Sequence, residues 1–460
     1  MPLAPGYRVV NQSRDATFIS GEPAEVRIES KYTLGNSGTT DLSFLDVTFP
    51  AAKPYGREGL RVEVDGKEVT PTELPDEDQF SRLNTLRIPL ESSWKRNESR
   101  ELEIEYAFRS PANPGVAIAI GGENFHLSSR GWQPLPQPPK HVLSPYPRRP
   151  DRTSYTVRVP SNFLVLARGT LAGRKQEGNE TEYRFILRKD DLTAFIVAGH
   201  YVASSPESKK ETGAIFWTFQ PLKENPAPAI ERISAAWNVL EKSFGPLDRH
   251  ILAPHIVEST DLTDHVTGEP GAAAVPFPGG ALVNAEALAL GIDSGDFVEM
   301  TTHALAHNWF GDEVFFAPDA AVGMGEGLPE YATVVVEEAL RGEPGRRERA
   351  IRYLTLYDQA AKEAKETPPG VTMMTDPLAQ RRIALAKAPL FFIALEDMCG
   401  EEPMRRGLLQ MVTLLRGQET SYDALRATLE ASCGKNLAQP FRVWLNDPGI
   451  PSDFRARYAR

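Results

Sequence analysis

The hydrophobic pattern of the chain changes its period near residue 225, and this change constrains the fold more than any other feature of the sequence. Over roughly the first 200 residues, apolar and polar side chains alternate with the period of two that a half-buried β-strand requires. From Asn225 onward, apolar residues recur at steps of three and four, as they do on one face of an α-helix. The sequence therefore predicts an α+β multidomain protein, with an N-terminal β domain and a mostly helical second domain.

The N-terminal half carries its strand signals in short alternating segments separated by turns. These strand-like segments are residues 24–34, 41–50, 100–108, 154–160 and 181–188. Asp65 and Gly66 lie between two alternating runs within residues 61–69, and Asp-Gly in that setting predicts a tight β-hairpin. No long amphipathic helix interrupts these segments, so we expect residues 1–205 to form an antiparallel β-sandwich or saddle.

The second half, residues 206–460, is expected to begin with a mixed lobe and to end with a helical one. A helix is predicted over residues 225–245, because its apolar side chains fall on one face. These side chains are Ile230, Ile233, Trp237, Leu240 and Phe244. A strand-like segment follows at residues 251–258, and the strand-containing lobe extends to about residue 290. Beyond it the pattern predicts helices over residues 294–310, 328–341, 344–366, 384–398, 402–416, 421–432 and 437–446.

Composition excludes several classes of function. Apolar residues make up 41% of the chain and charged residues 25%. This is the profile of a soluble globular protein. The net charge of -11 argues against a nucleic-acid or anionic-membrane surface. No apolar run approaches the roughly 20 residues of a membrane span, and no signal-peptide pattern follows Met1. We therefore expect a protein that is either cytoplasmic, or exported with a signal peptide that is absent from this chain.

The two cysteines, Cys399 and Cys433, are too few for a disulfide scaffold and offer no CxxC pair for a zinc site. A single bridge between them is possible if the protein is exported. Free cysteine is among the most buried residue types, so we expect two buried thiols.

Residues 303–313, HALAHNWFGDE, place two histidines four residues apart on a predicted helix. Residues i and i+4 lie on one helical face, so His303 and His307 can present ring nitrogens to a single ion. Such a pair also fits an ordinary core or surface role, and a third ligand decides between the two. Glu326 follows nineteen residues after His307, at the start of a second predicted helix. Two histidines and one carboxylate, with a fourth position open to water, form the ligand set of a catalytic zinc site.

This stretch, together with GMGEGLPEYA, resembles the HExxH-x18-E signature of the gluzincin zinc aminopeptidases, the family of membrane alanyl aminopeptidase and leukotriene A4 hydrolase. The signature continues with Trp-Phe-Gly, as Trp309, Phe310 and Gly311 do here. Residues 440–451, PFRVWLNDPGIP, are similar to the segment that closes the family's catalytic domain. The resemblance covers nearly the whole chain, without the large C-terminal helical domain of longer members. It implies a β saddle followed by a thermolysin-like domain. The ligands implied for one zinc ion per chain are His303, His307 and Glu326.

The chain departs from this family at three places where the family has catalytic or binding groups. Ala304 occupies the position of the glutamate that serves as general base, a contribution typically worth ~10²–10⁴-fold. Leu385 stands where the family's tyrosine stabilises the oxyanion, and leucine has no donor. Tyr353 and Tyr357 could reach in from an earlier helix, but we expect them to pack that helix. The segment 269–286 corresponds to the strand whose glutamate binds the substrate amine, yet no acid occurs from Pro270 through Ala285.

Three separate losses favour a zinc-binding, aminopeptidase-like protein that is inactive or strongly impaired in peptide hydrolysis. Such a protein would be retained for binding a peptide or a protein N-terminus. The candidate edge for an extended peptide is Gly279, Gly280 and Ala281. A first alternative is a genuine zinc aminopeptidase met here as an inactivated Glu-to-Ala variant. A second alternative is a metal-free interaction module in which the histidines are relics.

Overall fold

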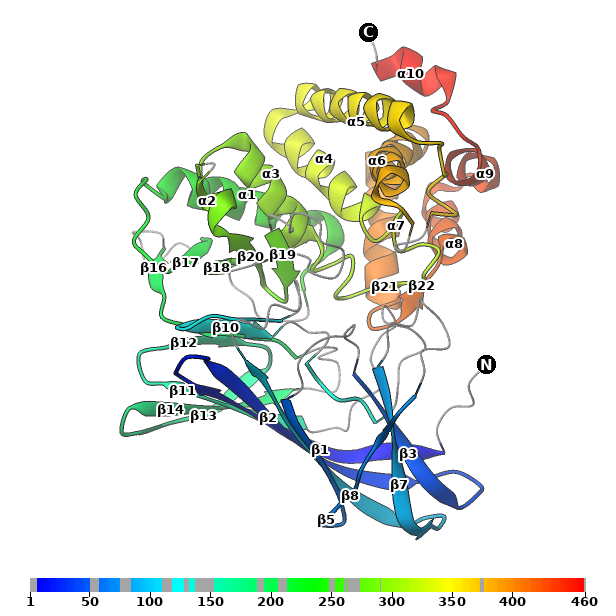
Figure 1. Ribbon diagram of the computed structural model, residues 1–460. Helices are drawn as coiled ribbons and strands as arrows, with labels where there is room; N and C mark the ends of the chain where they lie inside the picture. The colour runs from blue at the N-terminus through cyan, green and yellow to red at the C-terminus, as the bar shows by residue number, and fades with distance from the viewer. Residues whose placement is uncertain are drawn as a thin grey trace.

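The computed structural model describes most of the chain in defined segments. The described residues are 6–49, 58–74, 84–109, 118–127, 132–136, 153–187, 194–205, 213–247, 253–259, 262, 274–289, 291–372 and 376–458. The N-terminal strands form one body and the later helices another, and short strands lie between the two (Figure 1). This arrangement confirms the predicted α+β multidomain fold.

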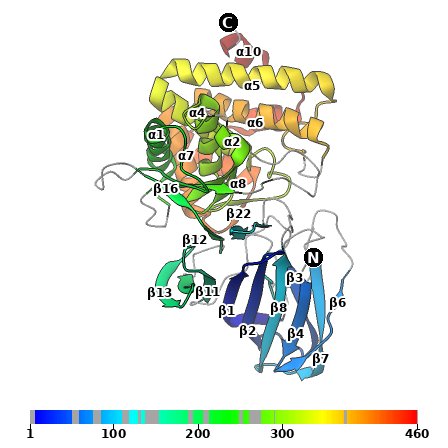
Figure 2. The same cartoon turned by 60° about the vertical axis from the view of Figure 1, so that its left-hand side comes forward.

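An eight-stranded sheet forms the base of the N-terminal half (Figures 1 and 2). Its strands, in spatial order, are β13 (Thr170–Glu177), β14 (Glu180–Leu187), β11 (Thr153–Pro160), β1 (Tyr7–Ile19), β2 (Glu25–Asn36), β8 (Ser99–Arg109), β4 (Glu58–Val64) and β5 (Lys67–Glu68). All neighbours are antiparallel except β1 and β11, which run parallel. The expected antiparallel sheet therefore contains one parallel pair.

Two smaller sheets accompany the large one. One consists of β3 (Leu42–Phe49), β7 (Asn84–Trp94) and β6 (Thr72–Glu73). The other consists of β12 (Leu164–Ala167), β15 (Ile196–Gly199), β10 (Asn124–Leu127) and β9 (Ile118–Ile120). Each strand-like segment of the sequence corresponds to a strand of the structure. The Asp65-Gly66 turn joins β4 to β5 with positive φ values of 51° and 75°. This is the conformation that an Asp-Gly hairpin requires.

A mixed five-stranded sheet opens the second half. Its spatial order is β16 (Val202–Ser204), β17 (Ile215–Thr218), β18 (His255–Ser259), β20 (Gly280–Asn284) and β19 (Ala274–Phe277). Strand β18 runs parallel to both of its neighbours, and β19 runs antiparallel to β20. Pro276 lies in the edge strand β19, where a residue without an N–H group is tolerated. The strands up to Gly199 pair within the N-terminal sheets, and strands β16 to β20 pair with one another. The domain boundary at residue 205 remains a prediction.

The helices that follow agree with the pattern of the sequence, with differences at their ends. They are α1 (Ala227–Phe244), α2 (Ala285–Ala289), α3 (Gly295–Ala306), α4 (Gly327–Arg341), α5 (Glu343–Glu363), α6 (Leu378–Cys399), α7 (Glu401–Leu414), α8 (Tyr422–Cys433), α9 (Ala438–Asn446) and α10 (Ser452–Tyr458). The short helices α2 and α10 were not predicted. Helix α6 begins ahead of the predicted start at residue 384. The sequence did not show these first residues as helical, because those just before Ile383 are polar and lie outside the apolar periodicity. None of the described helices is both long and apolar enough to cross a membrane.

Three groups of buried side chains hold these layers together. One fills the β half, and a larger one fills the space between the five-stranded sheet and the helices. The third and smallest joins the two halves, where Phe195 of the first contacts Phe277 of the second with ring centroids 4.9 Å apart. Polar contacts cross the same junction, including the buried Arg168 guanidinium, which donates to Asp312 at 3.3 Å. The residues that follow His307 are thus fixed against the β half.

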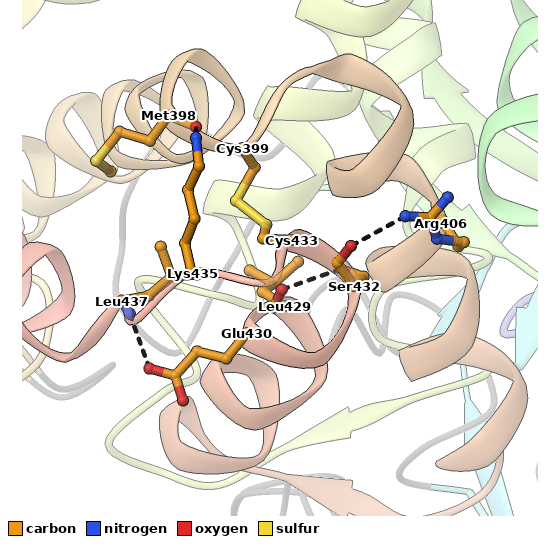
Figure 3. The surroundings of a disulfide bond; sticks show 9 residues. All are labelled: Met398, Cys399, Arg406, Leu429, Glu430, Ser432, Cys433, Lys435 and Leu437. Atoms are coloured by element: carbon orange, nitrogen blue, oxygen red, sulfur yellow. Dashed lines mark hydrogen bonds between the residues drawn. A yellow bond between two sulfur atoms is a disulfide. The ribbon is translucent and has the colours of Figure 1, made fainter.

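The two cysteines form a disulfide between the ends of two helices, contrary to the expected pair of thiols (Figure 3). Cys399 ends α6 and Cys433 ends α8, with their Cα atoms 5.2 Å apart. Beside the bridge, Lys435 donates to the carbonyl of Met398, and Arg406 donates to that of Ser432 at 2.9 Å. Burial alone does not distinguish a thiol from a half-cystine, so the sequence could not show that both side chains point toward each other.

Replacing both cysteines, as Cys399→Ser with Cys433→Ser, should lower the free energy of unfolding by about 3–4 kcal/mol. The reason is that the bridge restricts the unfolded chain between two cysteines separated by 34 positions in the sequence. The measurement is the urea midpoint of unfolding of the whole protein without reductant, monitored by the helical signal in circular dichroism. In the presence of reductant, the urea midpoint of the unsubstituted protein should decrease to that of the double variant. The midpoint of the double variant itself should not change. Equal midpoints for the oxidised and reduced protein would contradict a stabilising bridge.

Candidate metal centre

Helix α3 presents the two histidines at its C-terminal end. The helix begins after Ser294, whose side chain accepts a hydrogen bond from the N–H of Phe297 at 3.1 Å, as an N-cap residue does. It ends at Ala306, four residues short of the predicted end, and His307 is its C-cap with helical backbone angles. The spacing of four residues therefore still places His303 and His307 on one face. The chain then turns away at Gly311, which has a φ of 136°.

Helix α4 supplies the carboxylate from the residue just before its first turn. Glu326 is the N-cap of α4, and Gly327 begins the helix. A Cβ atom at Gly327 would lie 2.6 Å from the Cβ atom of Ala388 in α6, a distance that real atoms do not reach. Only glycine permits this contact, so α6 sets the position of the first turn of α4, and with it that of Glu326.

The three side chains meet in a triangle of ligand atoms. The Nε2 atoms of His303 and His307 are 3.1 Å apart. The Oε2 atom of Glu326 lies 3.4 Å from the former and 3.5 Å from the latter. Tetrahedral zinc, with bonds of about 2.0–2.1 Å, holds its ligand atoms about 3.3 Å apart. The donor set and its spacing therefore fit one zinc ion, as the sequence spacing predicted.

The ligand side chains are partly accessible to solvent. His303 is 23% exposed, His307 is 14% exposed and Glu326 is 33% exposed. A purely structural zinc site is closed by four protein ligands, whereas a catalytic site keeps one position open. Among the described residues, these three are the only metal-ligating groups that converge at this place. The arrangement is therefore of the open kind.

The electrostatics of the site favour a cation. Burial acts against a positive charge on His303, but the carboxylates of Glu330 and Glu326 outweigh it and raise the pKa of the imidazole from 6.5 to about 10. Burial likewise acts to raise the pKa of Glu326, but the two imidazoles hold that pKa well below its ordinary value. Positive charge is thus stabilised at the triangle, and a metal ion competes there with protons.

The backbone beyond His307 orients that histidine. Its Nδ1 atom lies 3.1 Å from the carbonyl oxygen of Phe310, so this nitrogen is set to donate and Nε2 is left free as a ligand. The next residue, Asn308, was not singled out from the sequence. Its Oδ1 accepts a hydrogen bond of 2.6 Å from the N–H of Gly279, which joins the end of α3 to the turn between β19 and β20. Only its place directly after the second histidine could have drawn attention to it.

Two of the three departures noted in the sequence lie on different helices, and of the third, the segment 269–286, residues 269–273 lie outside the described residues. Ala304 follows His303 in α3 and is 1% exposed, with its methyl group inside the core. Leu385 lies half-buried on α6, one turn ahead of Ala388. The hydroxyl of Tyr353 donates to Glu330 at 2.5 Å, and so this tyrosine is engaged on the far side of His303 from the triangle.

The glycines expected to bind an extended peptide do not lie at a free edge. Gly280 and Ala281 belong to β20, which pairs with β18 on one side and β19 on the other, and Gly279 lies in the turn. Both sides of β20 are occupied because β19 folds back along it. Among the described strands, none pairs with the outer edge of β19. Strand β19 also contacts α3. The edge of the sheet on this side is therefore β19, one strand before the strand that holds Gly280 and Ala281.

No protein-family model matches the sequence. The "Probable aminopeptidase 1" of Sulfurisphaera tokodaii is 22% identical over 410 residues, which cover 86% of this chain and 50% of that protein. The chain thus spans about half the length of the curated relative it matches.

Solved structures match over almost the entire chain. The M1 zinc metallopeptidase from Deinococcus radiodurans superimposes with a TM-score of 0.65 at 17% identity, covering 97% of this chain and 95% of that one. A Glu-to-Ala variant of an M1 zinc metallopeptidase from the same organism, bound to a Tyr-Ser-Ala substrate, gives a TM-score of 0.64 and covers 98% and 97%. The chain has the fold of the M1 zinc metallopeptidases. Its similarity to the gluzincin aminopeptidases, expected from the sequence, is confirmed at this level.

The protein freed of metal by a chelator should take up one zinc ion per chain, and His303→Ala should abolish that uptake. The loss should exceed the roughly 10–100-fold that removal of an outer partner of a ligand costs, because a ligand itself is removed. Titration calorimetry and elemental analysis give affinity and stoichiometry. His200→Ala, at an exposed histidine, is the matched control and should bind as the parent does. A parent protein that takes up no zinc at neutral pH would refute the metal centre.

Proposed function

We propose that this protein is a zinc-binding member of the M1 peptidase fold that has lost, or nearly lost, peptide hydrolysis and binds peptides instead. The single observation that carries the proposal is the complete ligand triangle beside Ala304. A zinc ion bound there would polarise a substrate carbonyl and lower the pKa of water toward about 7. His303, His307 and Glu326 would hold that ion.

Loss of the general base is the first support for this proposal. Among the described residues, the carboxylates within 4.0 Å of the two imidazoles are those of Glu326 and Glu330. Glu326 belongs to the triangle, and Glu330 approaches the Nδ1 side of His303, away from the ligand atoms. The methyl group of Ala304 can neither accept a proton from water nor return one to a leaving amine. Within the described ranges, no carboxylate beside the triangle therefore replaces the missing general base.

The positions that match the family's oxyanion and amine-binding groups also lack suitable side chains among the described residues. Leu385 offers no hydrogen-bond donor, and such a donor typically contributes roughly 10²–10³-fold, or about 2.7–4 kcal/mol. Strands β19 and β20 contain no acid that could pair with a protonated N-terminus. A single engineered change at position 304 does not account for these two further losses. They support natural loss of activity.

The edge strand supports a retained binding role. Strand β19 packs against α3, and Asn308 ties its turn to the end of that helix. An extended peptide added along β19 would therefore run beside the ligand triangle, held chiefly by main-chain hydrogen bonds. The Glu-to-Ala variant among the structural neighbours was solved with a peptide substrate bound. That neighbour supports peptide binding by this fold after loss of a glutamate.

Zinc-loaded protein should not hydrolyse aminoacyl or peptide substrates measurably, and Ala304→Glu alone should restore little. Groups that act as a unit in catalysis do not recover singly. The double variant Ala304→Glu with Leu385→Tyr should recover activity, because it restores both the base and an oxyanion donor. Product release is followed by mass spectrometry, and thermal melting checks folding, since residue 304 is buried.

The matched control for this experiment is Ala304→Gln with Leu385→Tyr, which has nearly the same shape but no base. It should stay inactive. Turnover near the ~10 s⁻¹ typical of enzymes from Ala304→Glu alone would show an ordinary peptidase met in an inactivated form, and would refute the proposed loss of function.

Peptide binding should be indifferent to the charge of the peptide's N-terminus. A hydrogen bond to a charged group is worth about 1.5–3 kcal/mol, so an enzyme with an amine-binding acid would prefer a free amine by more than about tenfold. Fluorescence anisotropy with one peptide in free and acetylated forms measures this ratio for the zinc-loaded protein. Here the two affinities should agree within about threefold, less than about 1 kcal/mol. A tenfold preference for the free amine, or no binding of either peptide, would contradict the proposal.

A further inference from the structure

The carboxylate of Glu330 stands outside the ligand triangle and touches it through His303. Glu326 and Glu330 are four residues apart at the start of α4, so they project from the same face of the helix. The Oε1 atom of Glu330 lies 3.2 Å from the Nδ1 atom of His303. Its other oxygen, Oε2, accepts a hydrogen bond of 2.5 Å from the hydroxyl of Tyr353 in α5.

The two histidines differ in the partner available to Nδ1. A histidine that binds a metal through Nε2 carries its proton on Nδ1, and an acceptor for that proton fixes both tautomer and ring orientation. His307 has the carbonyl of Phe310 in this role. For His303, no described group makes a hydrogen bond of good geometry to the buried Nδ1. The Glu330 carboxylate is the acceptor within reach, at the 3.2 Å contact.

Hydrogen bonds from neighbouring residues fix the position of Glu330. The Tyr353 hydroxyl that donates to its carboxylate also lies 3.2 Å from the Oγ1 atom of Thr333. Thr333 in turn donates to the main-chain carbonyl of Glu330 at 2.7 Å. Tyr353 is only 4% exposed, so its hydroxyl has a fixed direction. The side chain of Glu330 keeps 29% exposure.

We infer that Glu330 is a positioning residue, which orients His303 toward the metal and is itself held by Tyr353. This inference rests on the proposed zinc site. A carboxylate on Nδ1 makes Nε2 a stronger ligand and adds a second negative charge, beside Glu326, near a dication. It also makes α5 part of the metal centre, although α5 supplies no ligand.

A purely structural role for Glu330, as a tie between α4 and α5, predicts a different set of results. In that case Glu330→Ala and Tyr353→Phe would lower the melting temperature of the metal-free protein and leave zinc affinity unchanged once the protein is folded. A positioning role predicts a loss of affinity that follows the hydrogen-bond acceptor.

Zinc affinity is measured by competition with a chromophoric chelator. Glu330→Ala should weaken binding about 10–100-fold, the usual effect of removing such a partner. Glu330→Gln should weaken it less, because an amide oxygen still accepts, and Tyr353→Phe should also have a smaller effect. Glu343→Gln is the matched control, an exposed glutamate at the start of α5, and should bind as the parent does. Equal affinities for the parent and a folded Glu330→Ala would overturn the inference.

Cobalt(II) in place of zinc provides a readout that a structural role would not move. The exchangeable Nδ1–H protons of both histidines should give separate shifted NMR signals in the parent. In Glu330→Ala the His303 signal should broaden through exchange with solvent, while the His307 signal stays sharp as an internal reference. Two unchanged signals in Glu330→Ala would overturn the inference.

The outcomes separate this inference from the proposed function. A parent that binds neither zinc nor cobalt overturns the metal centre, and Glu330's role with it. A parent that binds both metals, with no difference in the variants, overturns the role of Glu330 alone. If Glu330→Ala does not fold, Glu330→Gln and Tyr353→Phe decide, since unchanged zinc affinity in both would refute positioning.

Discussion

The close contact between α4 and α6 at Gly327 is the constraint on which the metal centre depends. It fixes the first turn of α4 against Ala388 and so places Glu326 within 3.5 Å of both imidazoles. Three atoms with lone pairs converge there, and such a cluster is repulsive unless protons or a cation neutralise it. Against the effect of burial, the carboxylates raise the pKa of His303 and the imidazoles lower the pKa of Glu326, so a positive charge at the cluster is stabilised. The ligand triangle is therefore imposed by helix packing.

Buried charges stabilise the helix packing that imposes the ligand triangle. Lys387, adjacent to Ala388 and fully buried, donates to Glu366 at 3.0 Å and to the carbonyl of Asp447 at 2.6 Å. Glu366 also accepts from the N–H of Gly449 at 2.7 Å, so the segment after α9 is fastened to α6 beside the contact with α4. Removing one partner of a buried pair typically costs about 3–5 kcal/mol. The position of Glu326 is thus supported by ionic contacts as well as by apolar packing.

The sequence predicted those parts of the molecule that depend on local spacing. The ligands His303, His307 and Glu326 have fixed separations along the chain, and the alternating strands and most helices follow from hydrophobic period. It did not predict Glu330 or Asn308, because their roles arise from contacts between elements far apart in the chain. The sequence analysis expected a sheet edge at Gly280 and Ala281, but β19 ends the sheet, because a sequence does not show which strand lies outermost. The disulfide was missed because the cysteines are brought together only by the packing of α6 and α8.

The hydrogen bond from Gly279 to Asn308 gives the sheet edge and the metal centre a common mechanical part. A ligand that moves or stiffens β19 acts on the residue next to His307, and a metal that draws in His307 acts on the turn of β19. Coupling between two binding events is reciprocal in free energy, whichever ligand arrives first. If turnover has been lost, as proposed above, the fold can still respond to a peptide: occupancy of the edge strand would be reported as metal affinity, and metal content as peptide affinity.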